Sequence, residues 1–270
     1  MLGPCHKAAL PPELIEDRKK WADKLKELGH TSAWYHKNCV WFDPCNTVIP
    51  VAKRTVFDHG QNSKGKRKRW MSKGSKMKSE NLVATPLAAK QKQWADKRVW
   101  WYMVLARGKV VLHVMPVDYV QNGYGHADFV SKLPGLLRRK LGAGPLPKYA
   151  TTDRGPGLYQ ASSGTIVVAY RDALAAHGFK PFAGEEAKWQ PPDILDVLLH
   201  ETVASWVRAY FRKMPFGWKP KVEDNVKLFK KRLRKCEAHI NKNYNVDGLC
   251  KAFPRRIEAL IAAGGDRLRN

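Results

Sequence analysis

Apolar residues recur along the chain at two spacings, one typical of helices and one typical of strands. Within 12–28, Leu14, Trp21 and Leu25 follow the helical period, with proline near the start of the segment and Gly29 just past its end. This pattern predicts a helix with one buried face. The same reasoning predicts further helices over 126–141, 165–178, 193–214, 221–240 and 252–264, and Pro134 is expected to interrupt the first of these.

Short runs of β-branched and aromatic residues predict the strands. Residues 98–106 and 109–115 flank an Arg-Gly pair, a pattern typical of a hairpin. Residues 38–43 form another apolar run, which we expect Pro44 to end. Shorter strands are predicted over 46–50, 148–153 and 180–182.

The order of these elements predicts the fold class. A strand and a two-stranded hairpin precede alternating helices and strands, which favours an α/β fold of the ribonuclease H-like type with a mixed sheet. We expect an N-terminal helical lead-in over 1–37, a core over 38–214 that carries a basic insertion at 51–97, and a basic helical extension over 215–270.

Charge indicates the class of partner. The 270 residues include 49 Lys and Arg against 24 Asp and Glu, a net charge of +25, which favours a polyanion such as nucleic acid. Two basic tracts, 64–78 and 227–235, are predicted to contact phosphates. The residues assigned to DNA binding are Lys64, Lys66, Arg67, Lys68, Arg69, Lys73, Lys230, Lys231, Arg232 and Arg234.

Other features bear on compartment and cofactor. Five cysteines without a C-x-x-C pair predict reduced thiols in an intracellular, non-secreted protein, and no apolar stretch is long enough to predict a membrane partner. The run KGKRKR at 64–69 is typical of nuclear import in a eukaryote. No Walker A or G-x-G-x-x-G motif occurs, so no small-molecule cofactor is predicted.

Three acids stand on core elements of this basic chain. Asp43 and Asp153 end strand-like runs, and Glu201 lies on a strongly amphipathic helix. In a ribonuclease H-like sheet the two strands are neighbours, and a helix packing across them would bring the third acid close. Carboxylates are the ligands that Mg²⁺ or Mn²⁺ prefers, and a two-metal site of this kind cleaves phosphodiesters.

Other acids compete for these positions. Asp58 also ends an apolar stretch and is an alternative to Asp43, while Asp193 and Asp196 are alternatives to Glu201. The pair His200-Glu201 begins an H-E-x-x-H zinc signature, but the second histidine is missing, so that zinc site is not predicted.

Several segments resemble mariner-like transposases of the DDE superfamily. RKKWADKL followed by WYHKNCVWFD resembles the helix and strand that lead to the first aspartate of that family, and RWMSKGSK resembles its next conserved segment. RVWWYMVLARGKVVLHVM is similar to its hairpin, and TTDRGPG stands at the second aspartate. WQPPDILDVLLHE is similar to the run before the third acid, and EALIAAGGDRLRN to the family's ending.

The resemblance implies a function. Asp43, Asp153 and Glu201 would form a catalytic, metal-binding triad that cuts duplex DNA at transposon ends and transfers the strand, with self-association into a dimer to pair two ends. The family's N-terminal helix-turn-helix region has no counterpart in these residues. The alternative is a catalytically inactive, transposase-derived DNA-binding protein, and a basic RNA-binding or ribosome-associated protein is a third hypothesis.

Overall fold

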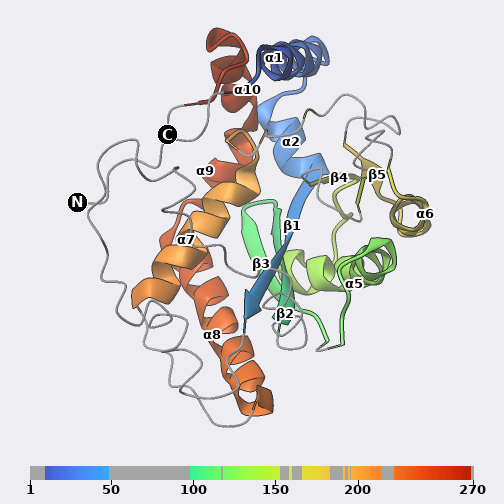
Figure 1. Cartoon of the computed structure of the whole chain (residues 1–270), viewed down its shortest axis with the longest axis vertical. Helices are drawn as coiled ribbons and strands as arrows, with labels where there is room; N and C mark the ends of the chain where they lie inside the picture. The colour runs from blue at the N-terminus through green and yellow to red at the C-terminus, as the bar shows by residue number, and fades with distance from the viewer. Residues whose placement is uncertain are drawn as a thin grey trace, which may run out of the picture.

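A computed structural model of the chain shows a central β-sheet with helices on both of its faces (Figure 1). The predicted insertion at 51–97 lies outside the residues that the structure describes. Those residues are 10–48, 98–116, 118–152, 158–159, 166–182, 191, 194, 196–213 and 222–268.

The described strands form one mixed sheet with the order β3-β2-β1-β4-β5. Strand β2 pairs antiparallel with both β1 and β3, whereas β4 pairs in parallel with both β1 and β5. The three antiparallel strands followed by parallel ones are the arrangement predicted from the element order. The bounds are β1 (Cys39–Val48), β2 (Arg98–Ala106), β3 (Lys109–Val114), β4 (Tyr149–Thr151) and β5 (Lys180–Pro181).

The hairpin of β2 and β3 confirms the prediction for this segment. Its two connecting residues, Arg107 and Gly108, have φ values of 45° and 71°. Positive φ at both positions is typical of the type I′ turn, whose twist matches that of the two strands. Glycine also fits because a Cβ at position 108 would lie 3.1 Å from the Cα of Asp247.

Strand β1 is longer than predicted, because Pro44 does not end it. The antiparallel register with β2 continues through the pair Pro44↔Tyr102 to Val48. On its other side β1 pairs with β4 only as far as Trp41, so beyond that residue this side of β1 is an edge among the described strands. A proline, which has no N–H to donate, is compatible with an edge.

Alternation along β1 divides its side chains between the two faces of the sheet. Val40 and Phe42 are fully buried with residues of α5 (Gly123–Leu141) and α6 (Val168–Ala176). Cys39 and Trp41 are fully buried on the opposite face. Since side chains alternate with a period of two, Asp43 belongs to the same face as Trp41.

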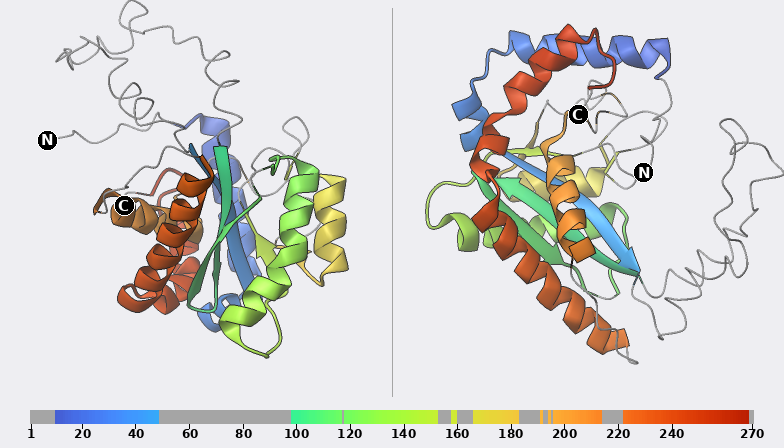
Figure 2. Two further views of the ribbon diagram at one scale, coloured as in Figure 1. Left: turned by 90° about the horizontal axis from the view of Figure 1, so that it is seen from below. Right: turned by 90° about the vertical axis from the view of Figure 1, so that its left-hand side faces the viewer.

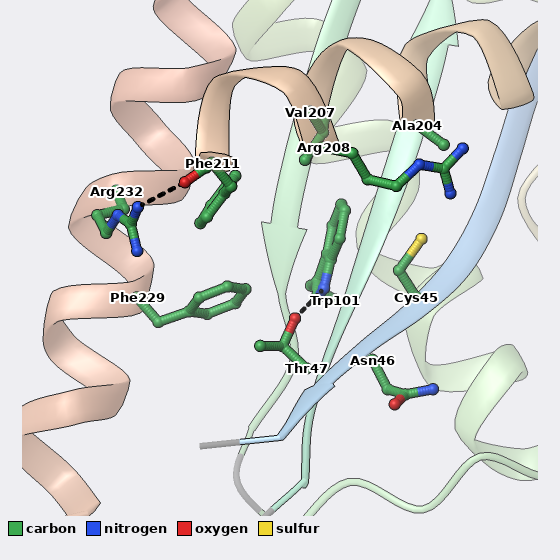
Figure 3. Close-up of a pocket in the computed structure, with 10 residues that line it drawn as sticks. All are labelled: Cys45, Asn46, Thr47, Trp101, Ala204, Val207, Arg208, Phe211, Phe229 and Arg232. Atoms are coloured by element: carbon green, nitrogen blue, oxygen red, sulfur yellow. Dashed lines mark hydrogen bonds between the residues drawn. The ribbon is translucent and has the colours of Figure 1, made fainter. Parts of the chain in front are cut away.

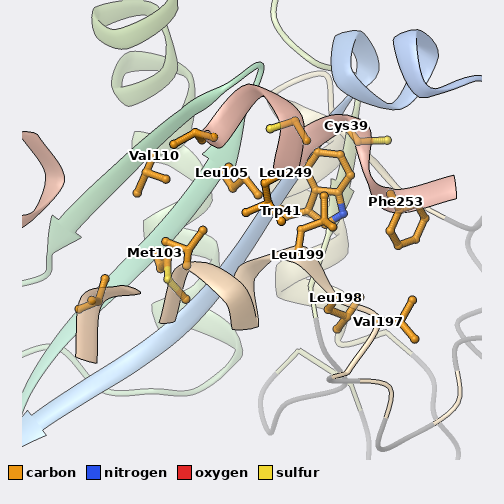
Figure 4. Packing of buried hydrophobic residues seen from close by; sticks show 14 of the residues in the cluster. Cys39, Trp41, Met103, Leu105, Val110, Val197, Leu198, Leu199, Leu249 and Phe253 are labelled. Atoms are coloured by element: carbon orange, nitrogen blue, oxygen red, sulfur yellow. The ribbon is translucent and has the colours of Figure 1, made fainter. Parts of the chain in front are cut away.

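That opposite face carries the larger hydrophobic cluster (Figure 4). Helix α7 (Leu199–Lys213) lies against β1 and β2, and α8 (Val222–Asn243) lies against β3, as the two views of Figure 2 show. The remaining helices gather at one end of the sheet: α1 (Pro12–Glu27), α2 (Ser32–Asn38), α9 (Val246–Lys251) and α10 (Phe253–Ala262).

Helix α8 also covers the free edge of β3. The Asn241 side chain accepts a hydrogen bond from the backbone N–H of Val110 and donates one to its carbonyl, both at 2.8 Å. The Glu237 carboxylate accepts from the backbone N–H of Leu112 at 2.8 Å. Side chains of a neighbouring helix thus occupy the backbone groups that an edge strand would otherwise expose.

Helix α5 differs from the predicted helix over 126–141 at its start and at Pro134. It begins at Gly123, because the Asn122 side chain accepts a hydrogen bond from the N–H of Gly125 and caps the first turn. Pro134 was expected to interrupt the helix but lies inside it. The buried neighbours Leu133 and Leu137 hold this turn against the sheet, so tertiary packing outweighs the local cost of proline.

Helix α7 begins six residues later than predicted, at Leu199 instead of residue 193. Ile194 and the residues from Asp196 to Leu198 are described but are not helical. They are held by tertiary contacts, an ion pair of Asp196 among them, that local periodicity does not reveal. The short helices α2 and α9 were not predicted, whereas α1, α6, α8 and α10 lie within a few residues of their predicted ranges.

Among the described helices, none combines the length and the apolar character needed to cross a membrane.

Candidate metal centre

Asp43 lies in the middle of β1, opposite Met103 of β2. Its side chain is on the sheet face covered by α7, and it is partly exposed. The neighbouring residue on the same face, Cys45, places its Sγ 3.6 Å from the Asp43 Oδ2. Asp43 is therefore at the point where the buried face of β1 begins to open beside α7.

The first turn of α7 supplies the other two groups. His200 is fully buried, and Glu201 next to it is partly exposed. The N-terminus of a helix carries the positive end of the helix dipole, so a carboxylate is favoured there. The amphipathic pattern of the segment positions Glu201 because Leu199 and Val203 on either side of it are buried in the sheet-facing cluster.

Asp43, His200 and Glu201 converge. One potential ligand atom from each lies within 4.8 Å of the corresponding atoms of the other two. Two ligand atoms on opposite sides of one cation, each about 2.1 Å from it, are about 4.2 Å apart. The three groups can therefore hold one divalent ion with a small inward adjustment.

Two further side chains shape the charge at this centre. Arg208, two turns along α7, places its Nη2 3.9 Å from the Glu201 Oε2, and its side chain is 61% exposed. Burial raises the pKa of the Cys45 thiol, and the Asp43 carboxylate raises it further, so Cys45 is a neutral thiol that donates weakly to Asp43. The centre thus has a cation at its open side and an uncharged group at its inner side.

His200 is electrically neutral at physiological pH. Burial lowers the pKa of His200 to about 3, and the nearby guanidinium of Arg256 lowers it further. Neither ring nitrogen has a hydrogen-bond partner among the residues that the structure describes. Arg256 itself is held by the carbonyls of Val197 and Leu198 and by the hydroxyl of Thr202, at 3.3, 3.1 and 2.6 Å.

A cavity of about 610 Å³ opens beside Asp43, between β1, β2, α7 and α8 (Figure 3). Its wall is largely apolar and aromatic, with Trp101, Phe211 and Phe229 contributing rings. Two cations line it, Arg208 from α7 and Arg232 from α8. The candidate centre therefore adjoins a cavity that is largely apolar and carries two arginines.

Asp196, an alternative to Glu201 in the sequence, is engaged elsewhere. Its carboxylate pairs with the fully buried guanidinium of Arg18, at 3.0 Å and 2.7 Å, and also accepts from the backbone N–H of Leu268 at 2.7 Å. Its side chain is only 1% exposed. The structure thus brings Glu201, and not Asp196, next to Asp43.

The other predicted acids and six of the ten predicted DNA contacts lie outside the described residues. This holds for Asp153, for the alternatives Asp58 and Asp193, and for the basic residues Lys64, Lys66, Arg67, Lys68, Arg69 and Lys73.

The remaining predicted DNA contacts lie on α8. Lys231 and Arg234 are exposed, and Lys230 is partly exposed. Arg232 differs from them, because it donates to the carbonyl of Phe211 at 3.3 Å and stacks over that residue's ring at 4.7 Å. It joins α8 to the end of α7 as well as lining the cavity.

Sequence reasoning missed His200, Cys45 and Arg208 as members of this centre. His200 was considered only as the start of a zinc signature. The sequence did contain a usable signal. A histidine on the apolar face of a helix is expected to be buried, and His200 is the direct neighbour of the candidate ligand Glu201. Cys45 gave a similar signal, because it lies two residues after Asp43 and so shares its face of the strand.

Comparison with known proteins places the fold. No model of a protein family matches this sequence, and no curated protein matches it. The catalytic domain of Mos1 mariner transposase is structurally similar, with a TM-score of 0.59, 12% identity, 96% of this chain covered and 98% of the other.

Two further structures of the same transposase agree. Its catalytic domain with raltegravir and manganese has a TM-score of 0.60 at 12% identity and covers 97% of this chain and 100% of the other. Its strand transfer complex has a TM-score of 0.59 at 14% identity and covers 99% of this chain and 68% of the other. The chain therefore has the ribonuclease H-like α/β fold of these catalytic domains, as its sequence predicted.

Proposed function

We propose that this chain is the catalytic domain of a DDE-type transposase, an endonuclease that cuts DNA with the help of divalent metal and then joins the freed end to a target. The observation that carries the proposal is the meeting of Asp43 and Glu201, although β1 and α7 are far apart in sequence. Cys45 and Arg208, which interact with these two acids, line the cavity. Solved structures of a mariner transposase share this fold.

The residues present suit Mg²⁺ or Mn²⁺. Asp43 and Glu201 offer carboxylate oxygens, the donors that these hard cations prefer. Asp153, which the sequence assigns to the same triad, would complete the set. When bound, a pair of such ions stabilises the attacking and the leaving oxygens of a phosphodiester.

The chain's own residues would hold the DNA. Arg208 is exposed beside Glu201, and Arg232 of α8 lines the same cavity as Arg208. Lys231 and Arg234 of α8 are exposed as well. Together with the net charge of +25, they favour a duplex whose phosphates cross this face. The rings of Trp101, Phe211 and Phe229 make one wall of the cavity apolar.

Self-association into a dimer belongs to the same proposal. The related transposase has been solved as a paired-end complex with a transposon end and as a strand transfer complex. If this chain acts in the same way, two copies assemble when two DNA ends are bound.

Nicking of supercoiled plasmid tests the proposal directly. We expect the wild-type chain to nick in Mn²⁺ or Mg²⁺, and Asp43→Asn, Asp153→Asn and Glu201→Gln each to abolish nicking while duplex binding stays within about twofold. Glu223→Gln is the matched control, because this acid is exposed on α8 away from the centre and its loss should change neither property.

Two results would contradict the proposal. Nicking that survives all three substitutions would show that another site cuts the DNA. Tight, salt-sensitive duplex binding with no nicking by the wild type in either metal would favour the alternative, a DNA-binding protein derived from a transposase that no longer cuts.

A further inference from the structure

His200 is buried, but no hydrogen bond within the described part of the chain compensates for the burial of its ring nitrogens. It is 0% exposed, and neither Nδ1 nor Nε2 has a hydrogen-bond partner among the described residues. Buried polar groups in folded proteins nearly always have a hydrogen-bond partner, and a buried group without one destabilises the fold. An unpartnered buried imidazole therefore points to a ligand that completes its contacts.

The surroundings of the ring indicate what that ligand is. Protein groups around His200 include the carboxylates of Asp43 and Glu201, each within 4.8 Å of a ring nitrogen. On the other side, Arg256 carries a positive charge but directs its hydrogen bonds to Val197, Leu198 and Thr202. A neutral ring nitrogen and two carboxylates facing one point attract a divalent cation.

We propose that His200 is a direct ligand of the metal held by Asp43 and Glu201, and that it makes this position select Mn²⁺ over Mg²⁺. The inference rests on the proposed metal site, and it adds a nitrogen donor to a set that would otherwise consist of oxygens. Mg²⁺ is bound almost entirely by oxygen, whereas imidazole is a good ligand for the first-row transition ions.

Selectivity follows from the chemistry of the donors. Replacing one oxygen ligand by imidazole strengthens binding along the series from Mn²⁺ to Zn²⁺ and gains little for Mg²⁺. The Sγ of Cys45 is not among the three converging ligand atoms; it makes a hydrogen bond with the Asp43 Oδ2, 3.6 Å away. His200 alone among the described residues gives the centre its nitrogen donor.

The first test is spectroscopic and needs no variant. Mn²⁺ is added to the whole chain labelled with ¹⁵N-histidine, and pulsed electron paramagnetic resonance measures coupling between the metal and nitrogen. Direct ligation predicts a strong ¹⁵N coupling in the wild type that is lost in His200→Leu and retained in His177→Leu. His177 is an exposed histidine at the C-terminal end of α6 and serves as the control, because it is not among the three converging groups.

The second test measures affinity and folding. Loss of His200 should weaken Mn²⁺ binding at least about tenfold, as expected for loss of a metal-site partner, while Mg²⁺ binding changes less than about twofold. The metal-free thermal midpoint of His200→Leu should equal or exceed that of the wild type, because an unpartnered polar ring is removed from the core. His200→Gln, which keeps a polar side chain, should show the same loss of Mn²⁺ selectivity.

The outcomes separate this inference from the proposed function. If Mn²⁺ binds, requires Asp43 and Glu201, but shows no nitrogen coupling, then His200 is not a ligand and the carboxylate site still stands. If His200→Leu lowers the metal-free midpoint and reduces Mg²⁺ and Mn²⁺ binding equally, the histidine is structural and the inference is overturned. If the wild type binds neither ion, both the inference and the metal-dependent function fall.

Discussion

Removal of the Asp196 carboxylate tests how the beginning of α7 is held in place. Asp196 and Arg18 form an ion pair whose side chains are 1% and 0% exposed. Arg18 joins the pair from α1, and it also donates to the carbonyls of Gly265 and Asp266, at 2.8 and 3.3 Å. Three segments far apart in sequence therefore depend on one guanidinium.

The expected magnitude follows from burial. In Asp196→Ala the guanidinium stays buried without its carboxylate, and the backbone N–H of Leu268 loses its acceptor. Breaking a buried pair by removing one partner costs about 3–5 kcal/mol, because an uncompensated charge remains. At this chain length about 2 °C of thermal midpoint correspond to each kcal/mol, so the midpoint should fall by roughly 6–10 °C.

The assay is thermal and denaturant unfolding of matched variants. Glu16→Ala is the control, because the pair Glu16–Lys20 lies on the same helix, α1, with side chains 65% and 68% exposed. Its removal should leave the midpoint nearly unchanged, since exposed pairs contribute little. A double-mutant cycle with Arg18→Met and Asp196→Leu should show a favourable coupling of about 1–3 kcal/mol between the two residues.

The pH dependence gives an independent check of the same pair. Burial favours a raised pKa for Asp196, but the hydrogen bonds from Arg18 and from the Leu268 N–H outweigh it and hold that pKa below its usual value. A lowered carboxyl pKa gives stability that is present above about pH 4 and is lost as the pH falls through the folded-state pKa. The difference in the free energy of unfolding between the wild type and Asp196→Ala should therefore become smaller in acid. A difference below about 1 kcal/mol at neutral pH, or one that grows in acid, would refute the reasoning.

Two other substitutions test the packing of the sheet. Asn241→Leu leaves the N–H and carbonyl of Val110 on the edge strand β3 without their partner, so we expect a loss of about 1–3 kcal/mol and faster aggregation by light scattering. Asn243→Leu, exposed on the same helix, should show neither effect. Trp41→Ala removes a fully buried ring from the face of β1 that α7 covers, and denaturant unfolding should show a loss of about 3–5 kcal/mol; a loss under 1 kcal/mol would contradict the assigned core.

The pattern of apolar and polar residues predicted those elements whose structure depends mainly on residues close to one another in the sequence. The hairpin of β2 and β3 follows from apolar strands on either side of Arg107-Gly108, since a two-residue turn with positive φ needs little help from the rest of the chain. Helix α1 followed from a proline at its start and a glycine after its end. The order of strands then predicted the sheet, because few topologies accommodate that sequence of elements.

Features that depend on distant contacts were not predictable in the same way. The seven-residue helix α2 is capped by Thr31 and held by Tyr35 in the core, and periodicity over so few residues carries little information. Strand β1 continues past Pro44 because β4 stops short of it, which only the assembled sheet shows. The late start of α7 likewise reflects the ion pair of Asp196 with a residue on α1.

The residues of the candidate centre also divide into those that the sequence predicted and those that only the folded structure reveals. Asp43 and Glu201 were chosen for their places at the end of a strand-like run and on an amphipathic helix, and the structure brings them together. His200 was not chosen, because its sequence position says only that it precedes Glu201. Its burial without a hydrogen-bond partner depends on the packing of α7 against the sheet.

Two acids five residues apart, Asp196 and Glu201, therefore have different tasks. Asp196 fixes the chain just before α7 to Arg18, while Arg256 of α10 binds the carbonyls of Val197 and Leu198 immediately after it. Hydrogen bonds thus connect the N-terminus of α7 to α1 and to α10 at one end of the sheet. Glu201 extends from the helical turn that these hydrogen bonds hold in place. A metal ligand must be held within about 0.5 Å of its productive place, which helices and their supporting contacts achieve better than loops. Arg18 and Arg256, which lie outside the centre, are consequently part of the reason that Glu201 can meet Asp43.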